Sequence, residues 1–350
     1  MRAVWIVTIF FGALLLFLVQ PLVGRLLLPR LGGTPAVWNT CMMFFQALLL
    51  AGYAWAHLLS RWSIRAQVIG HVAALLVGVL TLPIALRVTG TPPTNGSPIT
   101  WLLLALLGAV ALPFFALSAN APLLQRWFAG TDDPRAGDPY FLYAASNAGS
   151  LVGLLGYPLL VEPLLALGAQ RGTWIGGYAA CALATVVCGV LVLRRGVARA
   201  APDLAATPPT TAPARGAVAR WVLLAFVPSS LMLGVTQHLT TDVAAVPFLW
   251  AAPLALYLVT FIIAFARRAL ADATMTTQLF LLITIPTMLM APRWANFPIA
   301  LILLLHLGIL FSGALMCHCR LAAERPHPRY LTGFYLAVAA GGALGGIFNA

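Results

Sequence analysis

Long apolar runs alternate with short polar segments along the whole chain, and this pattern predicts membrane-spanning helices. Each run is close to the ~20 residues that an α-helix needs to cross a bilayer. Prolines interrupt the ninth and tenth runs, at Pro286, Pro292 and Pro298. We therefore expect an all-α, polytopic membrane helix bundle with about 11 transmembrane helices. The predicted spans are 4–23, 36–59, 67–87, 99–118, 139–161, 173–193, 221–238, 247–266, 275–291, 297–316 and 331–349.

One internal stretch differs from the rest of the chain in composition. Residues 194–220, RRGVARAAPDLAATPPTTAPARGAVAR, are rich in Pro, Ala, Thr and Arg and are too polar to span a bilayer. This composition is typical of a disordered segment, because it offers too little apolar surface to bury. We predict a disordered cytoplasmic linker at 194–220. It separates a first membrane half of six helices, 1–193, from a second half of about five helices, 221–350.

The two predicted halves share a sequence pattern. Matches at a near-constant offset indicate duplication of a unit. Two helical halves related by a parallel repeat are the layout of the major facilitator architecture. Because the second half has one helix fewer, we expect it to be incomplete at the C-terminus and the sequence to be part of a longer protein. A shift of 193 residues aligns Phe141, Ala144, Gly149, Leu151 and Gly153 with Phe334, Ala337, Gly342, Leu344 and Gly346.

The composition excludes a soluble globular domain and changes how the charge is interpreted. The chain is 61% hydrophobic and 8% charged, with a mean hydropathy of +0.95. Its net charge of +12 comes from arginines between the apolar runs. Most of these arginines fall on one side of the membrane if the N-terminus is cytoplasmic, as the positive-inside rule requires. We predict that orientation, with the lipid bilayer as a partner and no binding of nucleic acid.

The five cysteines mostly lie in apolar runs, so they predict buried side chains rather than a disulfide framework. Cys317-His318-Cys319 is the one cluster that suggests a metal. Residues two apart on a helix point about 200° away from each other, so the two thiols cannot share an ion there. The sequence therefore predicts no metal site, and it contains no motif for a cofactor.

Three stretches carry a resemblance to a known family. They are FLVQPLVGRLLLPRLGGTPAVWN at 17–39, DPYFLYAASNAGSLVGLLGYPLLVEPLLALGAQ at 138–170, and the segment 328–349. The chain resembles the membrane portion of bacterial fused major-facilitator/spermidine-synthase-like proteins over essentially its whole length. The resemblance implies a multi-pass protein of the bacterial inner membrane. It also implies a cytoplasmic aminopropyltransferase-like domain or subunit as a partner.

The catalytic part of that family is absent from this sequence. A synthase-like domain needs a glycine-rich strand-to-helix turn followed by acidic residues for its nucleoside cofactor. None of the eight acids follows such a turn. The glycine-rich segment 341–346 lies inside an apolar run, where it predicts close helix packing. We therefore expect this chain to have no enzymatic activity.

Polar residues inside the predicted spans are the main candidates for a functional site, because each must be paired or face water. The two-half architecture places a substrate cavity near the middle of the membrane. The alternative is that these amides bond neighbouring helices and contribute only stability, ~0.6 kcal/mol each on average. The cavity candidates are Gln20, Asn39, Gln46, Asn147 and Gln237, and Asn120, Ser146 and His238 are further polar positions.

Two acids, Glu162 and Asp242, lie near span ends on the predicted outer side and join the candidate set. A cation or proton pathway would use such carboxylates, although there are too few of them to favour a polyamine. Arg25, on the same side, is expected to contact lipid headgroups. His57 and His71 are expected to cap helices or to lie at the membrane interface.

These observations lead to two hypotheses about function. In the first, the chain moves a small solute by alternating access and contains a hydrated cavity lined by the candidate amides. In the second, it is a non-transporting anchor or scaffold for the synthase-like domain. An anchor would have a dry interior in which the same amides bond helix to helix.

Overall fold

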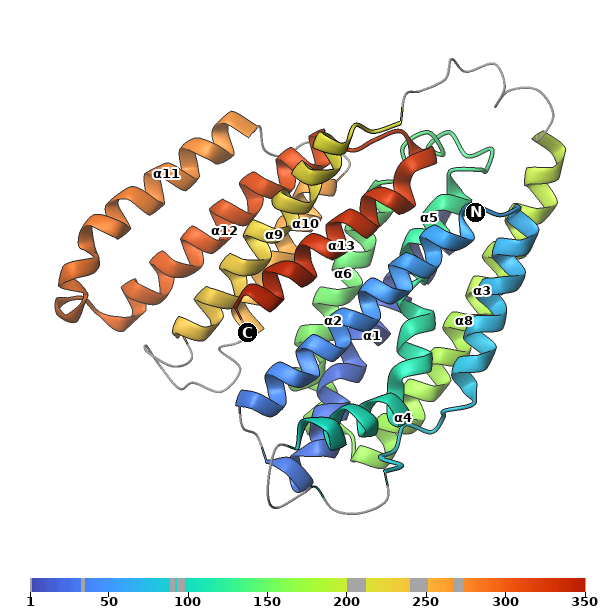
Figure 1. Ribbon diagram of the computed structural model, residues 1–350, viewed down its shortest axis with the longest axis horizontal. Coiled ribbons are helices and arrows are strands. Elements are labelled where there is room, and N and C mark those ends of the chain that lie inside the picture. The colour runs from blue at the N-terminus through green and yellow to red at the C-terminus, as the bar shows by residue number, and fades with distance from the viewer. Residues whose placement is uncertain are drawn as a thin grey trace. The chain divides into compact units, whose positions relative to one another are not determined.

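The computed structural model describes residues 2–32, 35–88, 92, 98–199, 212–239, 251–266 and 273–349. Within these ranges every regular element is a helix and no strand occurs (Figure 1). The chain forms two compact units. Unit 1 comprises Met1–Ala212 and His327–Leu336, and unit 2 comprises Pro213–Pro326 and Ala337–Ala350. The elements are α1 (Arg2–Leu31), α2 (Pro35–Leu59), α3 (Ile64–Val79), α4 (Ile99–Ser118), α5 (Asn120–Phe128), α6 (Phe141–Gly156), η1 (Tyr157–Val161), α7 (Glu162–Leu164), α8 (Leu167–Arg199), α9 (Arg215–His238), α10 (Ala251–Phe265), α11 (Ala273–Met290), η3 (Ala291–Asn296), α12 (Ile299–Ala323), η4 (Pro328–Tyr330) and α13 (Leu331–Phe348).

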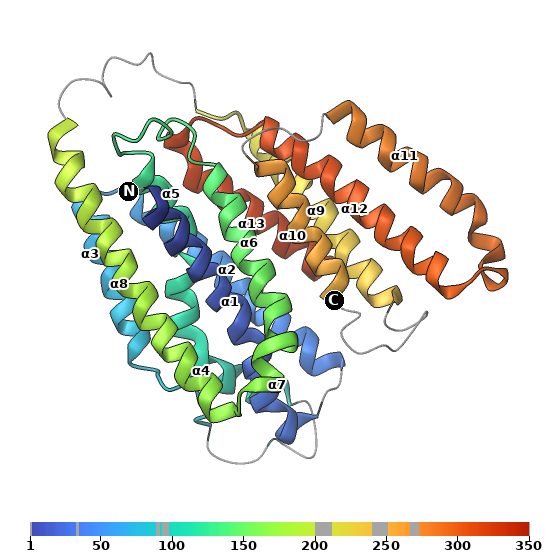
Figure 2. The same ribbon diagram turned by 180° about the vertical axis from the view of Figure 1, so that it is seen from behind.

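Unit 1 is built around α1. This helix packs along α6 and α8, while α2 and α3 both pack on α4. Helices α3 and α8 contact each other and lie side by side in both views of the ribbon (Figures 1 and 2). Large apolar side chains such as Trp5 and Trp127 are buried between these helices. An ion pair of 2.7 Å from Arg2 to Asp133 joins the start of α1 to the loop after α5.

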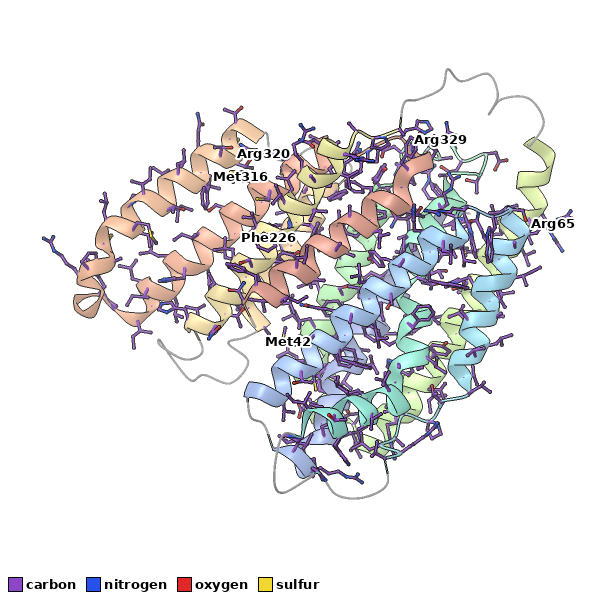
Figure 3. All side chains as sticks on the ribbon, viewed as in Figure 1. Met42, Arg65, Phe226, Met316, Arg320 and Arg329 are labelled. Atoms are coloured by element: carbon purple, nitrogen blue, oxygen red, sulfur yellow. The ribbon has the colours of Figure 1, made fainter. Side chains whose placement is uncertain are left out.

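Unit 2 is built around α12, which contacts α9, α10 and α11. Figure 1 shows α11 along one side of α12 and α9 along the other. Met232 of α9 packs against Leu310 and Ala314 of α12 in the core of this unit. Arg320, labelled in Figure 3, donates a hydrogen bond of 3.1 Å to the hydroxyl of Thr277, which joins α12 to α11.

The predicted spans correspond to helices of the structure. In the described ranges, nine helical segments are long and apolar enough to cross a membrane, and α3 and α10 are shorter apolar helices. Together they account for the eleven apolar runs, including the two that prolines interrupt. The prediction of an all-α, multi-pass membrane bundle is therefore confirmed.

One predicted span is wrong in its length. The run at 67–87 predicted a helix over its full extent, whereas α3 ends at Val79. The residues from Leu82 to Val88 follow without helical structure. Pro83 lacks the backbone N–H that a helix interior uses and so disfavours continuation of the helix, although it is apolar enough to extend a hydropathy run.

The helices beside the predicted linker extend further than expected. Helix α8 continues to Arg199 and α9 begins at Arg215, so both ends of the stretch 194–220 are helical. Arginine and alanine in these end segments favour helix strongly enough to continue it beyond the apolar run. The centre of the predicted linker, 200–211, lies outside the described residues.

Two glycines bring α6 into direct contact with the backbone of α1. A Cβ atom on Gly149 would collide with the carbonyl oxygen of Phe10. A Cβ on Gly153 would lie 2.7 Å from the carbonyl oxygen of Leu14. The four-residue spacing puts both glycines on one face, which is the small-xxx-small arrangement of closely packed membrane helices.

The same device recurs in unit 2 between α13 and α9. Gly341 lies against the carbonyl oxygen of Val222, and a Cβ on Gly345 would lie 2.6 Å from that of Phe226, whose side chain is labelled in Figure 3. The sequence alignment had matched Gly149 with Gly342, but a Cβ on Gly342 would meet nothing within 4 Å. In the packing of the helices, Gly341 and not Gly342 is therefore the equivalent of Gly149. Two positions are equivalent when both face the partner helix, whatever the residue type.

This one-residue difference gives a direct test. Gly341→Ala should lower the free energy of unfolding by about 1–3 kcal/mol, because the added methyl group meets rigid backbone. Gly342→Ala should be neutral or stabilising by up to ~1 kcal/mol, because alanine favours the helix more than glycine does. Thermal unfolding of the two variants in detergent compares them. Equal loss of stability in both would show that the assignment of the contacting face is wrong.

Candidate functional site

Gln20 and Asn147 are the two cavity candidates whose bonding the structure defines best. Gln20 lies half-buried on α1 and donates its amide N–H to the carbonyl of Leu16, at 3.2 Å. Asn147 is buried on α6 and donates to the carbonyl of Tyr143, at 2.8 Å. Each bond stays within its own helix. The alternative that these amides bond neighbouring helices therefore does not describe either of them.

Asn147 belongs to a larger polar and aromatic group in unit 1, which we call the amide–tyrosine cluster: Gln125, Tyr143, Asn147 and Tyr335. Tyr335, at the start of α13, donates its hydroxyl to the side-chain oxygen of Gln125 on α5, at 2.7 Å. Its ring packs on that of Tyr143 with 4.7 Å between the centroids. The amide nitrogen of Gln125 is buried and has no hydrogen-bond partner among the described residues. The cluster thus contains an unused donor inside an aromatic setting.

Asn147 was predicted from the sequence, whereas the other members of this cluster were not. Gln125 lies beyond the predicted span 99–118, in the nine-residue helix α5 that continues from α4. Tyr335 lies within the predicted last span, where tyrosine is an ordinary membrane residue. A search for buried glutamine beside helix ends would have found Gln125. No signal in the sequence pairs it with a residue 210 positions away.

The remaining amide candidates are not brought together by described contacts. Gln46 is half-buried on α2, and Asn39 lies seven residues earlier on the same helix. Seven residues are about two helical turns, so both positions share a face. The side chain of Asn39 and all of Asp242 lie outside the described residues. Gln237 is exposed in the last turn of α9.

Glu162 is paired with Arg25, whereas the sequence predicted that Arg25 contacts lipid headgroups. The closest charged atoms are 3.7 Å apart, and each side chain is 38% exposed. Glu162 directly follows the π-helical turn η1, which contains Pro158. Such turns recur at functional sites, but an ion pair this exposed contributes only ~0–1 kcal/mol to stability. Arg25 lies about 7.5 Å of helical rise beyond Gln20 on α1.

A second polar network, around Asn120, joins three helices of unit 1. The ring nitrogen Nε2 of His71 donates to the amide oxygen of Asn120, at 2.8 Å, and the hydroxyl of Thr185 donates to the same oxygen, at 3.1 Å. The amide nitrogen of Asn120 donates to the sulfur of Cys181, at 3.4 Å. All these groups are buried. The amide of Asn120 therefore bonds neighbouring helices, which is the arrangement predicted for polar residues that contribute only to stability.

The prediction that His71 caps a helix or lies at the interface is therefore wrong. The residue is fully buried on α3 and contacts α5. His57 has a more exposed setting and contacts the hydroxyl of Thr332 at 3.0 Å. Both histidines lie near the ends of apolar runs. His71 is buried and His57 is not because other helices pack around this part of α3.

His318, in the Cys-His-Cys segment, is enclosed in unit 2. Its ring stacks on that of Phe261 with 3.5 Å between the centroids, and it forms a hydrogen bond of 2.9 Å with the hydroxyl of Thr260. Helix α12 runs through Cys317, His318 and Cys319 without a break. Adjacent side chains of this segment therefore point in different directions, as the helical geometry of the sequence predicted.

The fold of the whole chain is similar to that of several solved structures. The human organic anion transporter MFSD10 (TETRAN) matches with a TM-score of 0.58 and 14% sequence identity, over 98% of this chain and 91% of that one. A double-tryptophan mutant of XylE matches with a TM-score of 0.56 and 12% identity, over 98% and 86%. No protein-family model matches the sequence, and no curated protein matches it.

These similarities define the class of protein. The chain is a multi-pass membrane protein with a major-facilitator-like helical fold, as its hydropathy pattern and its repeat predicted. The sequence identities are low, so the similarity shows the fold alone. The chemistry of any site has to be inferred from the residues of this chain.

Proposed function

We propose that this protein is a membrane transporter that moves a small solute by alternating access. The observation that supports the proposal best is the hydrogen bonding of three buried or half-buried amide side chains in unit 1. Gln20 and Asn147 bond only within their own helices, and the amide nitrogen of Gln125 has no partner among the described residues. Leaving a buried donor unpaired costs about 1–3 kcal/mol. Water or a polar solute would recover that energy.

The proposal has a finer form that follows from the family resemblance. In that form the chain is the membrane part of a bacterial fused spermidine-synthase-like protein, placed in the inner membrane with its N-terminus cytoplasmic. Residues 1–193 and 221–350 form its two membrane halves. The chain itself is not catalytic, and its partners are the bilayer, a small solute and a synthase-like domain or subunit.

The second candidate function is a non-transporting anchor for that domain. The network around Asn120 favours it, because there the polar side chains are buried and bond three helices together. An anchor needs only such internal bonds. A transporter additionally needs polar positions that water reaches, so access of water to Asn147 and Gln20 separates the two functions.

Water access can be measured by cysteine labelling. In a variant with the five native cysteines replaced by alanine, Asn147→Cys or Gln20→Cys would be treated with a charged, membrane-impermeant thiol reagent. Val152→Cys is the matched control on α6, since Val152 is exposed on the surface of the helix and lies about 140° around it from Asn147. A lipid-facing thiol does not meet a charged reagent.

A transporter should label at Asn147→Cys and Gln20→Cys and not at Val152→Cys. Labelling should occur from either side of the membrane in sealed vesicles, because alternating access exposes the same residues to both sides in turn. If both test positions stay unlabelled from both sides while the protein remains folded, the interior is dry. The transporter proposal would then be abandoned in favour of the anchor.

A further inference from the structure

One buried glutamine in the amide–tyrosine cluster uses only half of its amide group. Gln125 lies in the last turn of α5 and is 0% exposed. Its side-chain oxygen accepts the hydroxyl proton of Tyr335, at 2.7 Å, whereas its amide nitrogen is buried and has no partner among the described residues. A buried donor without an acceptor is unfavourable. The nitrogen of Gln125 therefore requires an acceptor that the surrounding described helices do not provide.

A second tyrosine–glutamine pair in unit 1 shows the same contact in a saturated form. Tyr157 in η1 donates its hydroxyl to the side-chain oxygen of Gln170 on α8, at 3.0 Å. The amide nitrogen of Gln170 donates in turn to the backbone carbonyl of Leu165, at 2.8 Å. Gln170 is 2% exposed, so the two glutamines are equally buried. The fold can thus satisfy a buried pair of this kind completely, and it does not do so at Gln125.

Asn147 supplies the opposite kind of group to the same cluster. It is 7% exposed, its amide nitrogen donates to the carbonyl of Tyr143, and its side-chain oxygen accepts no hydrogen bond from the described residues. Tyr143, one helical turn earlier on α6, packs its ring on that of Tyr335. The cluster therefore offers a donor from Gln125 and an acceptor from Asn147. Hydroxyl groups and uncharged amides match both, because they accept and donate hydrogen bonds.

The described contacts of Gln125, Asn147 and Tyr335 involve no charged side chain. The ring of Tyr335 also lies 5.4 Å from that of Phe334, between centroids. A charged solute brought to these residues would lose its hydration without meeting an opposite charge. An uncharged solute can instead place an apolar face on the aromatic rings. The groups that act electrostatically on the hydroxyl of Tyr335 are likewise uncharged: Gln125, Tyr53, Tyr140 and Tyr143.

We propose that the amide–tyrosine cluster binds an uncharged solute whose hydroxyl or amide groups both accept and donate hydrogen bonds. Gln125 donates to the solute, Asn147 accepts from it, and the rings of Tyr143 and Tyr335 contact its apolar face. The inference rests on the proposed transport function and names the class of solute. Gln125 and Tyr335 are buried, so the solute reaches them only when the helices around them separate during alternating access. Polyamines and solutes with a carboxylate or phosphate group do not fit this site.

The test is calorimetric titration of the purified full chain in detergent with matched solutes. Glucose is compared with glucuronate, uridine with uridine monophosphate, and spermidine serves as the cation. Glucose or uridine should bind at least about tenfold more tightly than its charged counterpart and than spermidine, because the site has no counter-charge. A charged counterpart that binds as tightly as the uncharged solute would overturn the proposal. So would the absence of binding by both glucose and uridine.

A double variant separates loss of the site from loss of folding. Gln125→Met/Tyr335→Phe replaces both partners of the hydrogen bond by apolar groups of similar shape, so it should retain the thermal midpoint. It should weaken binding of the uncharged solute at least about tenfold, because the donor to the solute is gone. The matched control is Gln170→Met/Tyr157→Phe, which removes the saturated pair and should leave binding unchanged. Equal binding by Gln125→Met/Tyr335→Phe and the unmodified chain would show that the cluster is not the site.

Thiol labelling distinguishes failure of this inference from failure of the transport proposal. If the reagent reaches Asn147→Cys from both sides of the membrane while neither glucose nor uridine binds, transport stands and the class of solute is wrong. If Asn147→Cys and Gln20→Cys both stay unlabelled, the transport proposal fails and the solute site fails with it.

Discussion

Replacing Gly149 with leucine should prevent α1 and α6 from packing and should destabilise the protein more than any other single change considered for this chain. A Cβ atom at this position already collides with the carbonyl oxygen of Phe10. A backbone oxygen inside a membrane helix cannot move aside as a flexible side chain does. Overpacking of this kind costs typically 1–3 kcal/mol, and contact with rigid backbone places the expected loss at or above about 3 kcal/mol.

The matched control is Gly156→Leu on the same helix. A Cβ at Gly156 would meet nothing within 4 Å, so a side chain can begin there without the backbone collision found at Gly149. The measurement is the thermal midpoint in detergent, together with the yield of monodisperse protein in size-exclusion chromatography. Gly156→Leu should behave as the unmodified chain does. Comparable behaviour of Gly149→Leu would refute the close α1–α6 contact.

Asn120→Leu should give the second largest effect, because one amide joins several buried partners. Leucine is similar in size but accepts no hydrogen bond from Nε2 of His71. The other ring nitrogen of His71 is buried and has no partner among the described residues, so the variant leaves the whole ring unbonded. Each buried unsatisfied group costs about 1–3 kcal/mol, and we expect a loss of about 2–3 kcal/mol in the free energy of unfolding.

Two further variants separate this cause from general damage to the core. Ser118→Ala, two residues away, removes a buried hydroxyl that donates only to Phe114 within its own helix, and should cost under about 1 kcal/mol. Adding His71→Leu to Asn120→Leu should restore part of the lost stability, since removing both partners leaves nothing unsatisfied. If the stability losses of the two single variants add up in the double variant, the hydrogen bond between His71 and Asn120 is not the cause of the loss in Asn120→Leu.

The helices themselves follow from the sequence. Hydropathy over about 20 residues reflects only whether a segment prefers lipid to water. This preference depends on the residues of that segment and not on contacts with other helices. For this reason each of the eleven runs contains a helix within the described residues. The errors lie at helix ends. Helix α3 is shorter than its apolar run, and arginine-containing segments extend α8 and α9 beyond theirs, because hydropathy does not register backbone donors or helix propensity.

The partners of the polar residues do not follow from the sequence. Asn120 and Asn147 have the same side chain and similar apolar flanks, yet Asn120 joins three helices and Asn147 bonds within its own. Which of these occurs depends on the angle at which each residue projects and on which helix covers that angle. Both quantities are set by helices that are distant in sequence.

The sequence by itself thus determined the type of the membrane helices and their approximate number. The tertiary structure alone decided that Gly341 rather than Gly342 touches α9, that Glu162 pairs with Arg25, and that His238 lies against His306. The physical reason is the range of the interactions. The free energy of transferring a segment into lipid is a sum over residues that are neighbours in the sequence. A contact between side chains of two helices additionally requires a defined rotation and depth of each helix.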